Sequence, residues 1–407
     1  MTETTFSGLG LAAPILTALD SGRYHSPTPI QAGAIPPLLA GRDLLGIAQT
    51  GTGKTAAFAL PLLHLLSEAR ERPSRQGVRA LVLAPTRELA VQIFESFAAY
   101  GRNLKLRRAV LVGGVAQGPQ RSALAQGVDI LVATPGRLLD HMEQGNVHLQ
   151  SVRHLVLDEA DRMLDMGFIR DVRKIVAALP KGRQSVLFSA TMPADVGTLA
   201  RDMLKDPVRI EVTPKVVTVE RIHQRVHHVA QGGKPALLVG LLGDPAYRRV
   251  IVFTRTKRGA NRVAETLGKA GIAADAIHGN KSQNARQGAL ERFRNGKARV
   301  LVATDIAARG LHVSEVSHVI NYELPSEPET YVHRIGRTAR AGAAGEAISF
   351  CDAGELGALR DIERLTGRSM EAVGEAAKAP PRAAKSPVKT PARAGRPRRR
   401  FHRAAAA

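Results

Sequence analysis

Lys54 and Thr55 close a glycine-containing segment that lies between a short apolar run, Asp43–Ile47, and a helix-like run, Ala56–Arg70. A strand that leads through such a turn into a helix offers backbone N–H groups and the positive end of the helix dipole to an anion. The lysine can reach the outer phosphates of a nucleoside triphosphate, and the threonine hydroxyl can bind magnesium. The sequence therefore predicts a phosphate-binding loop formed by Ala48, Gln49, Thr50, Gly51, Thr52, Gly53, Lys54 and Thr55, with Ala48 where the usual pattern has glycine.

A second group of reactive side chains follows another apolar run. Val152–Leu157 is typical of a buried strand, and Asp158, Glu159 and Asp161 come directly after it. In an open parallel sheet, ligands bind outside the carboxyl ends of the strands. Two strand ends should therefore bring a lysine, a hydroxyl group and three carboxylates to one crevice. This makes a glycine-rich turn without a ligand the weaker interpretation of Ala48–Thr55.

The charge balance indicates a polyanionic partner. The chain has 407 residues, a formal net charge of +22 and a pI near 10.9. Such an excess favours nucleic acid first and an acidic membrane surface second. Aromatic residues make up only 4% and tryptophan is absent, so we expect contact with the sugar–phosphate backbone rather than stacking on bases.

The compartment is expected to be the cytoplasm. The single cysteine, Cys351, cannot form an internal disulfide and fits a reducing environment. Met1–Gly10 lacks the pattern of a signal peptide, and no apolar run approaches the ~18 residues of a membrane span. We therefore predict no membrane association.

Short aliphatic runs alternate with helix-like runs, which is typical of βαβ units and parallel sheets. The expected strands of the first half are Asp43–Ile47, Val78–Ala84, Leu106–Val112, Val128–Val132, Val152–Leu157 and Gln184–Phe188. The same alternation begins again in the second half, where the expected strands are Ile222–Val229, Arg249–Phe253, Ala274–Ile277, Arg299–Ala303, Val316–Asn321 and Glu346–Phe350. The predicted fold class is α/β, with two similar parallel sheets in tandem and a cleft between them.

The chain divides into five predicted segments. They are an N-terminal motif region at 1–34, a first domain at 35–210, a linker at 211–220, a second domain at 221–370 and a tail at 371–407. The linker contains Pro214 and has no sustained amphipathic pattern. Lys378–Ala407 contains ten Lys or Arg residues and no acidic residue, so we expect a disordered basic tail. Its Arg-dense end favours nucleic-acid capture over a purely solubilising role.

The motifs between Phe6 and about Gly367, in this order and spacing, resemble those of the DEAD-box RNA helicases, most closely the bacterial RhlE-type subgroup. The resemblance implies two tandem RecA-like P-loop domains, ATP and Mg²⁺ as cofactors, and RNA as a partner bound mainly through its backbone. Pro27–Gln31 looks like the family's adenine-reading motif, with Phe6 as the upstream aromatic. The Gln31 amide matches the donor and acceptor of adenine, and Tyr24 can stack on the base.

The resemblance also implies a catalytic set divided between the domains. Lys54 would bind the β- and γ-phosphates, Thr55 and Asp158 would hold magnesium, and Glu159 would orient the attacking water. Cations that stabilise the charge developing on the γ-phosphate would come from the second domain, because Tyr331–Arg340 resembles the family's arginine-finger motif. The implied catalytic residues are Lys54, Asp158, Glu159, Arg337 and Arg340.

Further residues are implied by the same resemblance. Ser189 and Thr191 would hydrogen-bond Asp161 and connect the ATP state to the RNA state. The implied coupling residues are Ser189, Thr191, Asp161, Asp305 and His333. The implied RNA-binding residues are Pro85, Thr86, Arg87, Gly113, Gly114, Thr134, Pro135, Gly136 and Arg137 in the first domain, and Thr254, Arg255, Gln283, Arg286, Thr304 and Gly310 in the second.

The expected activity is that of an RNA-dependent ATPase and ATP-dependent RNA helicase. Closure of the cleft would bend one RNA strand and expel its partner from a short duplex. Two alternatives stay open: an ATP-gated RNA clamp or annealing chaperone, which the basic tail favours, and a DNA helicase. The cellular RNA, the oligomeric state and the protein partners are not determined by the sequence.

His312 is the main departure from the family pattern, which normally has an aspartate that contacts the ATP ribose. An imidazole is larger and carries no fixed negative charge, so we expect ATP binding to be weaker by ~1–2 kcal/mol, about the cost of one unmade polar contact. His312→Asp should accordingly lower the KM for ATP. An unchanged KM in steady-state ATPase assays would contradict this expectation.

Overall fold

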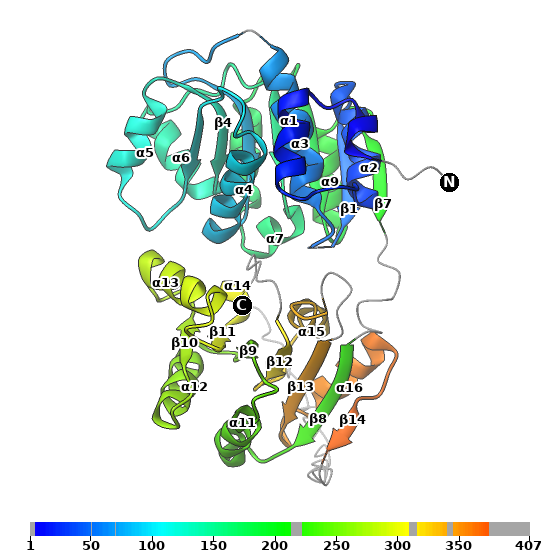
Figure 1. Cartoon of the computed structure of the whole chain (residues 1–407), viewed down its shortest axis with the longest axis vertical. Helices are drawn as coiled ribbons and strands as arrows, with labels where there is room; N and C mark the ends of the chain where they lie inside the picture. Colours follow the sequence, from blue (N-terminus) through cyan, green and yellow to red (C-terminus); the bar gives the residue numbers. More distant parts are fainter. Residues whose placement is uncertain are drawn as a thin grey trace, which may run out of the picture.

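Two parallel β-sheets, one in each half of the chain, form the framework of the protein (Figure 1). The computed structural model describes residues 5–49, 51–69, 71–212, 222–308, 316–339 and 345–373. Within these residues each sheet has seven strands, and every strand pairs with its neighbours in parallel. The predicted fold class is confirmed. No helix within the described ranges is long and apolar enough to cross a membrane.

The first domain contains a sheet in the order β3-β4-β2-β5-β6-β1-β7. Its strands are β1 (Leu44–Ala48), β2 (Val78–Leu83), β3 (Arg108–Leu111), β4 (Val128–Ala133), β5 (His154–Leu157), β6 (Gln184–Ser189) and β7 (Val208–Val212). Its helices are η1 (Phe6–Leu9), α1 (Ala13–Ser21), α2 (Pro29–Leu39), α3 (Lys54–Glu68), α4 (Arg87–Tyr100), α5 (Gln117–Leu124), α6 (Pro135–Glu143), α7 (Ala160–Asp165), α8 (Ile169–Ala177) and α9 (Ala194–Met203).

The second domain repeats this connectivity in the order β10-β11-β9-β12-β13-β8-β14. Its strands are β8 (Ile222–His228), β9 (Val250–Phe253), β10 (Ala274–Ile277), β11 (Val300–Ala303), β12 (His318–Asn321), β13 (Gly345–Cys351) and β14 (Glu371–Val373). Its helices are η2 (Gln231–Gly233), α11 (Lys234–Gly243), α12 (Lys257–Lys269), α13 (Gln283–Arg294), α14 (Asp305–Ala308), α15 (Pro328–Ile335) and α16 (Leu356–Thr366).

Each sheet has one edge strand that the sequence analysis did not predict. β7 ends at Val212, inside the predicted linker, and β14 at Glu371–Val373 lies inside the predicted tail. Both strands are short and lack a continuous apolar run, because an edge strand buries little of its surface. They form by pairing with β1 and β8, respectively. Most of the predicted tail, including Lys378–Ala407, lies outside the described residues.

The strand register aligns the carboxyl ends that position the candidate site. Leu157 at the end of β5 is opposite Leu83 of β2 and Leu187 of β6. Ser189 at the end of β6 is in turn opposite Ile47 of β1. The segments that follow these strands therefore emerge at the same edge of the first sheet.

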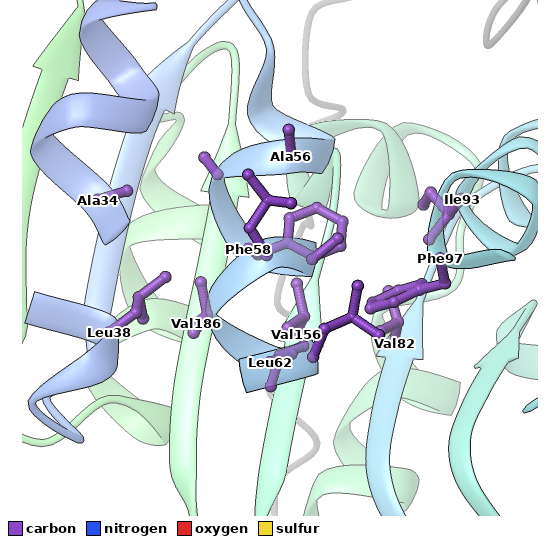
Figure 2. Close-up of a cluster of buried hydrophobic side chains, with 14 of the residues drawn as sticks. Ala34, Leu38, Ala56, Phe58, Leu62, Val82, Ile93, Phe97, Val156 and Val186 are labelled. Atoms are coloured by element: carbon purple, nitrogen blue, oxygen red, sulfur yellow. The ribbon is translucent and has the colours of Figure 1, made fainter. Parts of the chain in front are cut away.

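Side chains of successive strand residues in the first domain pack into two separate cores. Val82 belongs to the core beneath α1 to α4, whereas its neighbours in β2 belong to the core on the opposite face. Figure 2 shows the first core, in which Phe58 of α3 packs over the strands. Its ring lies 5.8 Å from that of Phe188 and 6.2 Å from that of Phe97. This packing fixes the helix that carries the phosphate loop.

Replacing Phe58, which is fully buried, should destabilise the first domain. Phe58→Ala is expected to lower the free energy of unfolding by about 3–5 kcal/mol, because it removes apolar contacts and leaves a cavity. Urea unfolding followed by circular dichroism would measure the change. Leu365→Ala, at a position that is 47% exposed, is the control and should change it little. A loss below about 1 kcal/mol for Phe58→Ala would contradict the expectation.

Candidate nucleotide and nucleic-acid site

The predicted phosphate loop connects β1 to α3. Gly53, the N-cap residue of α3, has a φ of 97°, a left-handed conformation that favours glycine. A Cβ atom at Gly53 would come within 2.4 Å of Gln31 Nε2, so a side chain has no room here. The Thr52 hydroxyl donates to the Gln49 carbonyl at 2.8 Å and closes the turn. Ala48 ends β1, Gly51 also has a left-handed φ, and Thr50 lies outside the described residues.

Lys54 is the first residue of α3, and its side chain is buried. The ammonium group donates to the carbonyl of Ala48 at 2.8 Å, across the base of the loop. Thr55 follows as the second helical residue and is partly buried. The loop thus holds its cation against its own backbone, at the positive end of a helix. This arrangement fits an anion such as a nucleotide phosphate.

Asp158 follows β5 and is 2% exposed. Its Oδ1 is buried and has no hydrogen-bond partner among the described residues. Burial raises the pKa of Asp158 to about 7, with a further upward contribution from Glu159, while the nearby ammonium of Lys54 acts in the opposite direction. A buried carboxylate oxygen without a partner is a suitable ligand for a hard divalent cation such as magnesium.

Glu159 has a φ of 55°, a left-handed conformation that is uncommon for residues other than glycine. Its carboxylate forms a short ion pair with Arg162, three residues later on α7. The sequence analysis did not identify Arg162, although its spacing from Glu159 could have indicated the pair. The backbone conformation and the arginine together hold this carboxylate in one orientation beside Asp158.

The predicted adenine-reading motif adjoins the phosphate loop. The Gln31 side chain accepts a hydrogen bond from Thr28 N at 2.9 Å and donates one to the Gly53 carbonyl at 3.1 Å. The residue thereby connects the start of α2 to the end of the loop. Tyr24 is 50% exposed and packs edge-on against Tyr100, whereas Phe6 is buried in the core.

The hydrogen bonds expected around Asp161 are present in the structure. Its Oδ2 accepts hydrogen bonds from Thr191 N and Thr191 Oγ1, both at 2.9 Å, and from Ala190 N at 3.2 Å. The Ser189 hydroxyl accepts from Asp161 N at 3.2 Å and donates to the Thr191 carbonyl at 2.7 Å. The acidic motif after β5 is therefore tied to the segment after β6.

Several predicted RNA-binding residues of the first domain lie on loops and helix starts. Thr86 caps α4 by accepting a hydrogen bond from Leu89 N at 3.2 Å. The Arg87 guanidinium covers Gly114, where a Cβ atom would lie 2.0 Å from Arg87 Nη1. Arg137, near the start of α6, is largely buried, and its Nε and Nη1 have no hydrogen-bond partner among the described residues. The other members of this set are Pro85 before α4, Gly113 beside Arg87, Thr134 as the N-cap of α6, and Pro135 and Gly136 in its first turn.

Residues predicted to bind RNA also meet across the two domains. Arg87 Nη1 lies 3.4 Å from Gln283 Oε1, at the start of α13. Arg286, one turn later, forms an ion pair with Glu88 at 2.9 Å, and the side chains are only 13% and 6% exposed. Figure 1 shows α13 at the boundary between the two halves. The sequence analysis missed Glu88, which directly follows Arg87 and supplies the anion for this contact.

The second domain holds its remaining predicted residues at strand ends and around α15. Thr254 and Thr304 directly follow β9 and β11, and both are buried. Asp305 forms a two-point ion pair with Arg334, at 2.6 and 2.8 Å. Arg337 is also largely buried. Arg255 follows Thr254, and His333 precedes Arg334 on α15, whereas Gly310, His312 and Arg340 lie outside the described residues.

Comparison with known proteins agrees with this assembly. Residues 28–199 match the family described as DEAD/DEAH box helicase, and residues 233–342 match the helicase conserved C-terminal domain. The DEAD-box ATP-dependent RNA helicase CshA of Bacillus cereus is 45% identical over 368 residues, which cover 90% of this chain and 69% of that protein. The chain belongs to the DEAD-box helicase family. Its enzyme class is therefore that of the ATP-dependent RNA helicases.

Other relatives of this DEAD-box helicase support the same placement. The ATP-dependent rRNA helicase rrp3 of Sclerotinia sclerotiorum is 45% identical over 369 residues, covering 90% of this chain and 76% of that protein. The structure of S. cerevisiae Dbp5 bound to RNA and ADP BeF3 has a TM-score of 0.81 at 34% identity, covering 91% of this chain and 95% of that chain. A DEAD-box protein from Methanococcus jannaschii is 39% identical and covers 91% of this chain and 99% of that chain, with a TM-score of 0.53.

With Asp158 as a predicted magnesium ligand, its raised pKa predicts that the magnesium requirement of the ATPase depends on pH. Below about pH 7 the carboxyl holds a proton that a metal ion must displace, so the Mg²⁺ concentration for half-maximal ATPase activity should rise by up to about ten-fold per pH unit as the pH falls from 7. Above pH 8 it should be constant. ATPase titrations with MgCl₂ between pH 5.5 and 8.5 would measure this dependence.

Asp158→Asn is the matched control, because it keeps the titration of ATP itself and removes that of the carboxyl. Any residual activity of this variant, or its binding of Mg²⁺–nucleotide, should show a weaker dependence on pH. The same pH dependence in both proteins would contradict the assignment to Asp158.

Proposed function

We propose that this DEAD-box helicase is an RNA-dependent ATPase that separates short RNA duplexes by closing its two domains on one strand and bending it. The observation that carries the proposal is the contact of Arg87 and Glu88 in the first domain with Gln283 and Arg286 in the second. A surface predicted to bind RNA thus includes the surface on which the domains meet. A ligand that binds both halves of such a surface favours the arrangement that brings them together.

The ATP site lies at the edge where β1, β5 and β6 end. The loop Gly51–Lys54 would surround the β- and γ-phosphates with backbone N–H groups and the Lys54 ammonium. Because Gln31 also donates to the Gly53 carbonyl, the binding of adenine to Gln31 would be coupled to the conformation of the loop. Glu159 would orient a water molecule toward the γ-phosphorus, once its pair with Arg162 leaves one carboxylate oxygen available to it.

Thr55 and Asp158 are the residues that would hold magnesium. The buried Oδ1 of Asp158 without a hydrogen-bond partner supports this assignment. Bound there, the metal ion would neutralise phosphate charge and keep the phosphates in place. The charge that develops on the γ-phosphate would also be stabilised by Arg337 and Arg340 of the second domain, which we assign as arginine fingers.

The RNA track would run over the loops and helix starts of both domains. Backbone N–H groups at the starts of α4, α6 and α13 suit phosphate groups, as do the glycines at 113 and 114. Arg137 has guanidinium N–H groups without a hydrogen-bond partner, and a phosphate would provide one. The low aromatic content supports recognition of the backbone over recognition of bases.

The arrangement of the domains supports closure around both ligands. Alignment to Dbp5 bound to RNA and ADP BeF3 covers 91% of the chain with a TM-score of 0.81, and alignment to Mss116 bound to ssRNA and UDP-BeF covers 92% with 0.82. Such values over a two-domain chain support a relative placement of the domains similar to that in these two structures. The hydrogen bonds of Asp161 with Thr191 would couple nucleotide binding at the ATP site to the conformation of the RNA-binding surface.

Two finer assignments stay predictions. The relatives described above carry the names CshA and rrp3, so membership of the RhlE-type subgroup rests on the sequence motifs alone. The basic tail could add RNA capture or annealing to the activity, and it lies outside the described residues.

Two substitutions test the proposal. In the unmodified chain, single-stranded RNA should raise the ATPase rate strongly. Lys54→Ala should reduce the RNA-stimulated rate by more than about 100-fold, because it removes the cation at the phosphates. Glu159→Gln should reduce turnover similarly while the protein still binds RNA and a nucleotide, since the amide keeps the shape of the side chain. ATPase assays and fluorescence anisotropy with labelled RNA measure both effects.

Lys269→Ala is a matched lysine control, because this side chain is 75% exposed on α12 and pairs only with Glu265 among the described residues. It should keep wild-type ATPase and unwinding rates. An ATPase rate that does not respond to RNA, or a Glu159→Gln variant that cannot bind RNA, would argue against the proposal.

A further inference from the structure

The second sheet contains a positional counterpart of the phosphate loop. β8 occupies the place of β1, between the counterparts of β6 and β7, because the two sheets share one connectivity. β8 leads through Gln231–Gly233 into α11, and the first residue of α11 is Lys234, as Lys54 is the first residue of α3. Both lysines are buried.

The counterpart lacks the features that hold phosphate. The connection from β8 to α11 has the same length as the phosphate loop, but Gly233 has a φ of −86° where Gly53 has 97°. Pro235 stands where Thr55 offers a hydroxyl group, so no metal ligand follows the lysine. We therefore expect no nucleotide at this edge of the second sheet.

Carboxylates of the protein itself pair with the lysine in this place. Lys234 is 1% exposed, and its Nζ lies 2.5 Å from Glu355 Oε2 and 3.2 Å from Asp352 Oδ2. Both acids follow β13. A buried ammonium and a buried carboxylate each need such a partner, because neither can be left unpaired away from water.

Glu355 is the centre of this cluster. Its carboxylate is 4% exposed and accepts from four donors. Oε2 accepts from Lys234 and from Asp352 N, at 3.3 Å. Oε1 accepts from Arg255 Nη2 at 3.0 Å and from Leu324 N at 3.1 Å. Contacts on both oxygens fix the carboxylate, so it can serve as a rigid anchor.

The anchor acts on Arg255, whose side chain is 44% exposed. Arg255 N donates to Glu323 Oε2 at 2.6 Å, and one guanidinium nitrogen is held by Glu355. Arg255 also borders a cavity of about 390 Å³ between α11 and α12. A half-exposed arginine that is held at one nitrogen keeps its other N–H groups available in a fixed direction.

The anchor also reaches α15 through a chain of hydrogen bonds. Leu324 N, held by Glu355, directly follows Glu323, whose carbonyl accepts a hydrogen bond from Arg334 Nη1 at 2.6 Å. Arg334 is in turn paired with Asp305. Glu355 thus supports a segment that contacts α15 as well as Arg255.

We propose that Glu355, held in place by the buried Lys234, is a positioning residue that fixes the Arg255 guanidinium for contact with an RNA phosphate. This rests on the proposed function, which places Arg255 on the RNA track. A free arginine side chain loses rotamer entropy when it binds, and an arginine that is already held loses less. In the first domain Lys54 would bind phosphate directly. Its counterpart Lys234 would affect RNA binding indirectly, by holding Glu355, which in turn holds Arg255.

A double-mutant cycle tests this inference. The dissociation constant for a labelled single-stranded RNA, with a non-hydrolysable ATP analogue present, would be measured across a salt series for Arg255→Gln, Glu355→Gln and the double variant. Each single variant should weaken binding by about ten-fold, the loss of one charge-assisted contact. The double variant should be no weaker than Arg255→Gln, because Glu355 acts only through Arg255. Each should lower the salt slope by about 0.7, the value for one phosphate contact on a single strand.

Asp352→Asn is the matched control, because Asp352 also pairs with Lys234, whereas the ion pair of Arg255 is with Glu355. It should bind RNA like the unmodified chain. If Glu355→Gln does not fold, Glu355→Asp gives the same test, since the shorter side chain keeps the charge beside Lys234 but does not reach Arg255.

Additive losses in the double variant, or unchanged RNA binding in a folded Glu355 variant, would overturn the positioning role. Unchanged binding in Arg255→Gln would also overturn it, while leaving the proposed function intact. That function is judged separately, by the response of the unmodified chain's ATPase to RNA.

Discussion

The alignment of the carboxyl ends of β1, β5 and β6, which places Lys54 and Asp158 at one edge of a parallel sheet, is the constraint on which the site of the first domain depends. Lys54 lowers the pKa of a carboxyl that burial raises, so the two groups stabilise each other in a place where neither is well solvated. They come from segments more than a hundred residues apart in the chain. Only the parallel register of β1, β6 and β5 brings them together, and the core around Phe58 holds that register.

The two domains use one topology for two purposes. In the first, the helix that follows β1 begins with a lysine after a glycine-containing loop, and the fixed charges nearby suit a phosphate and a metal ion. In the second, the corresponding lysine is neutralised by Glu355 and Asp352. This difference follows from backbone conformation, because Gly53 before Lys54 is left-handed, whereas Gly233 before Lys234 is not. In the second domain Arg334 is buried against Asp305, whereas Arg255, held by Glu355, keeps 44% of its side chain exposed.

The contact between the domains is ionic and small. Arg286 and Glu88 are buried against each other. Removing either charge would leave the other buried without a partner, which is costly. An RNA strand at this surface would contact both domains, since Arg87 belongs to the first and Arg286 to the second. The charges that join the domains thus lie within the surface predicted to bind RNA, which is a physical basis for coupling between closure and binding.

The sequence determined the fold class, the phosphate loop, the acidic motif and the family. These features depend on local patterns: an apolar run of strand length, glycines before a lysine, and carboxylates directly after a strand. The edge strands β7 and β14 escaped prediction because they bury little and are defined only by pairing with β1 and β8. Arg162 and Glu88 escaped because charged residues on helices are common, and no local pattern separates a paired one from a solvated one.

Only the tertiary structure decided which charges meet. The pairs Glu88–Arg286 and Lys234–Glu355 join residues that are more than a hundred positions apart. The first pair forms where the two domains meet, and the second forms because β8 and β13 are neighbours in one sheet. The raised pKa of Asp158 likewise results from burial, which the sequence does not specify. Sequence thus fixes the chemical groups and their order along the chain, whereas the energies of buried charges depend on the partners and the solvent exclusion that folding provides.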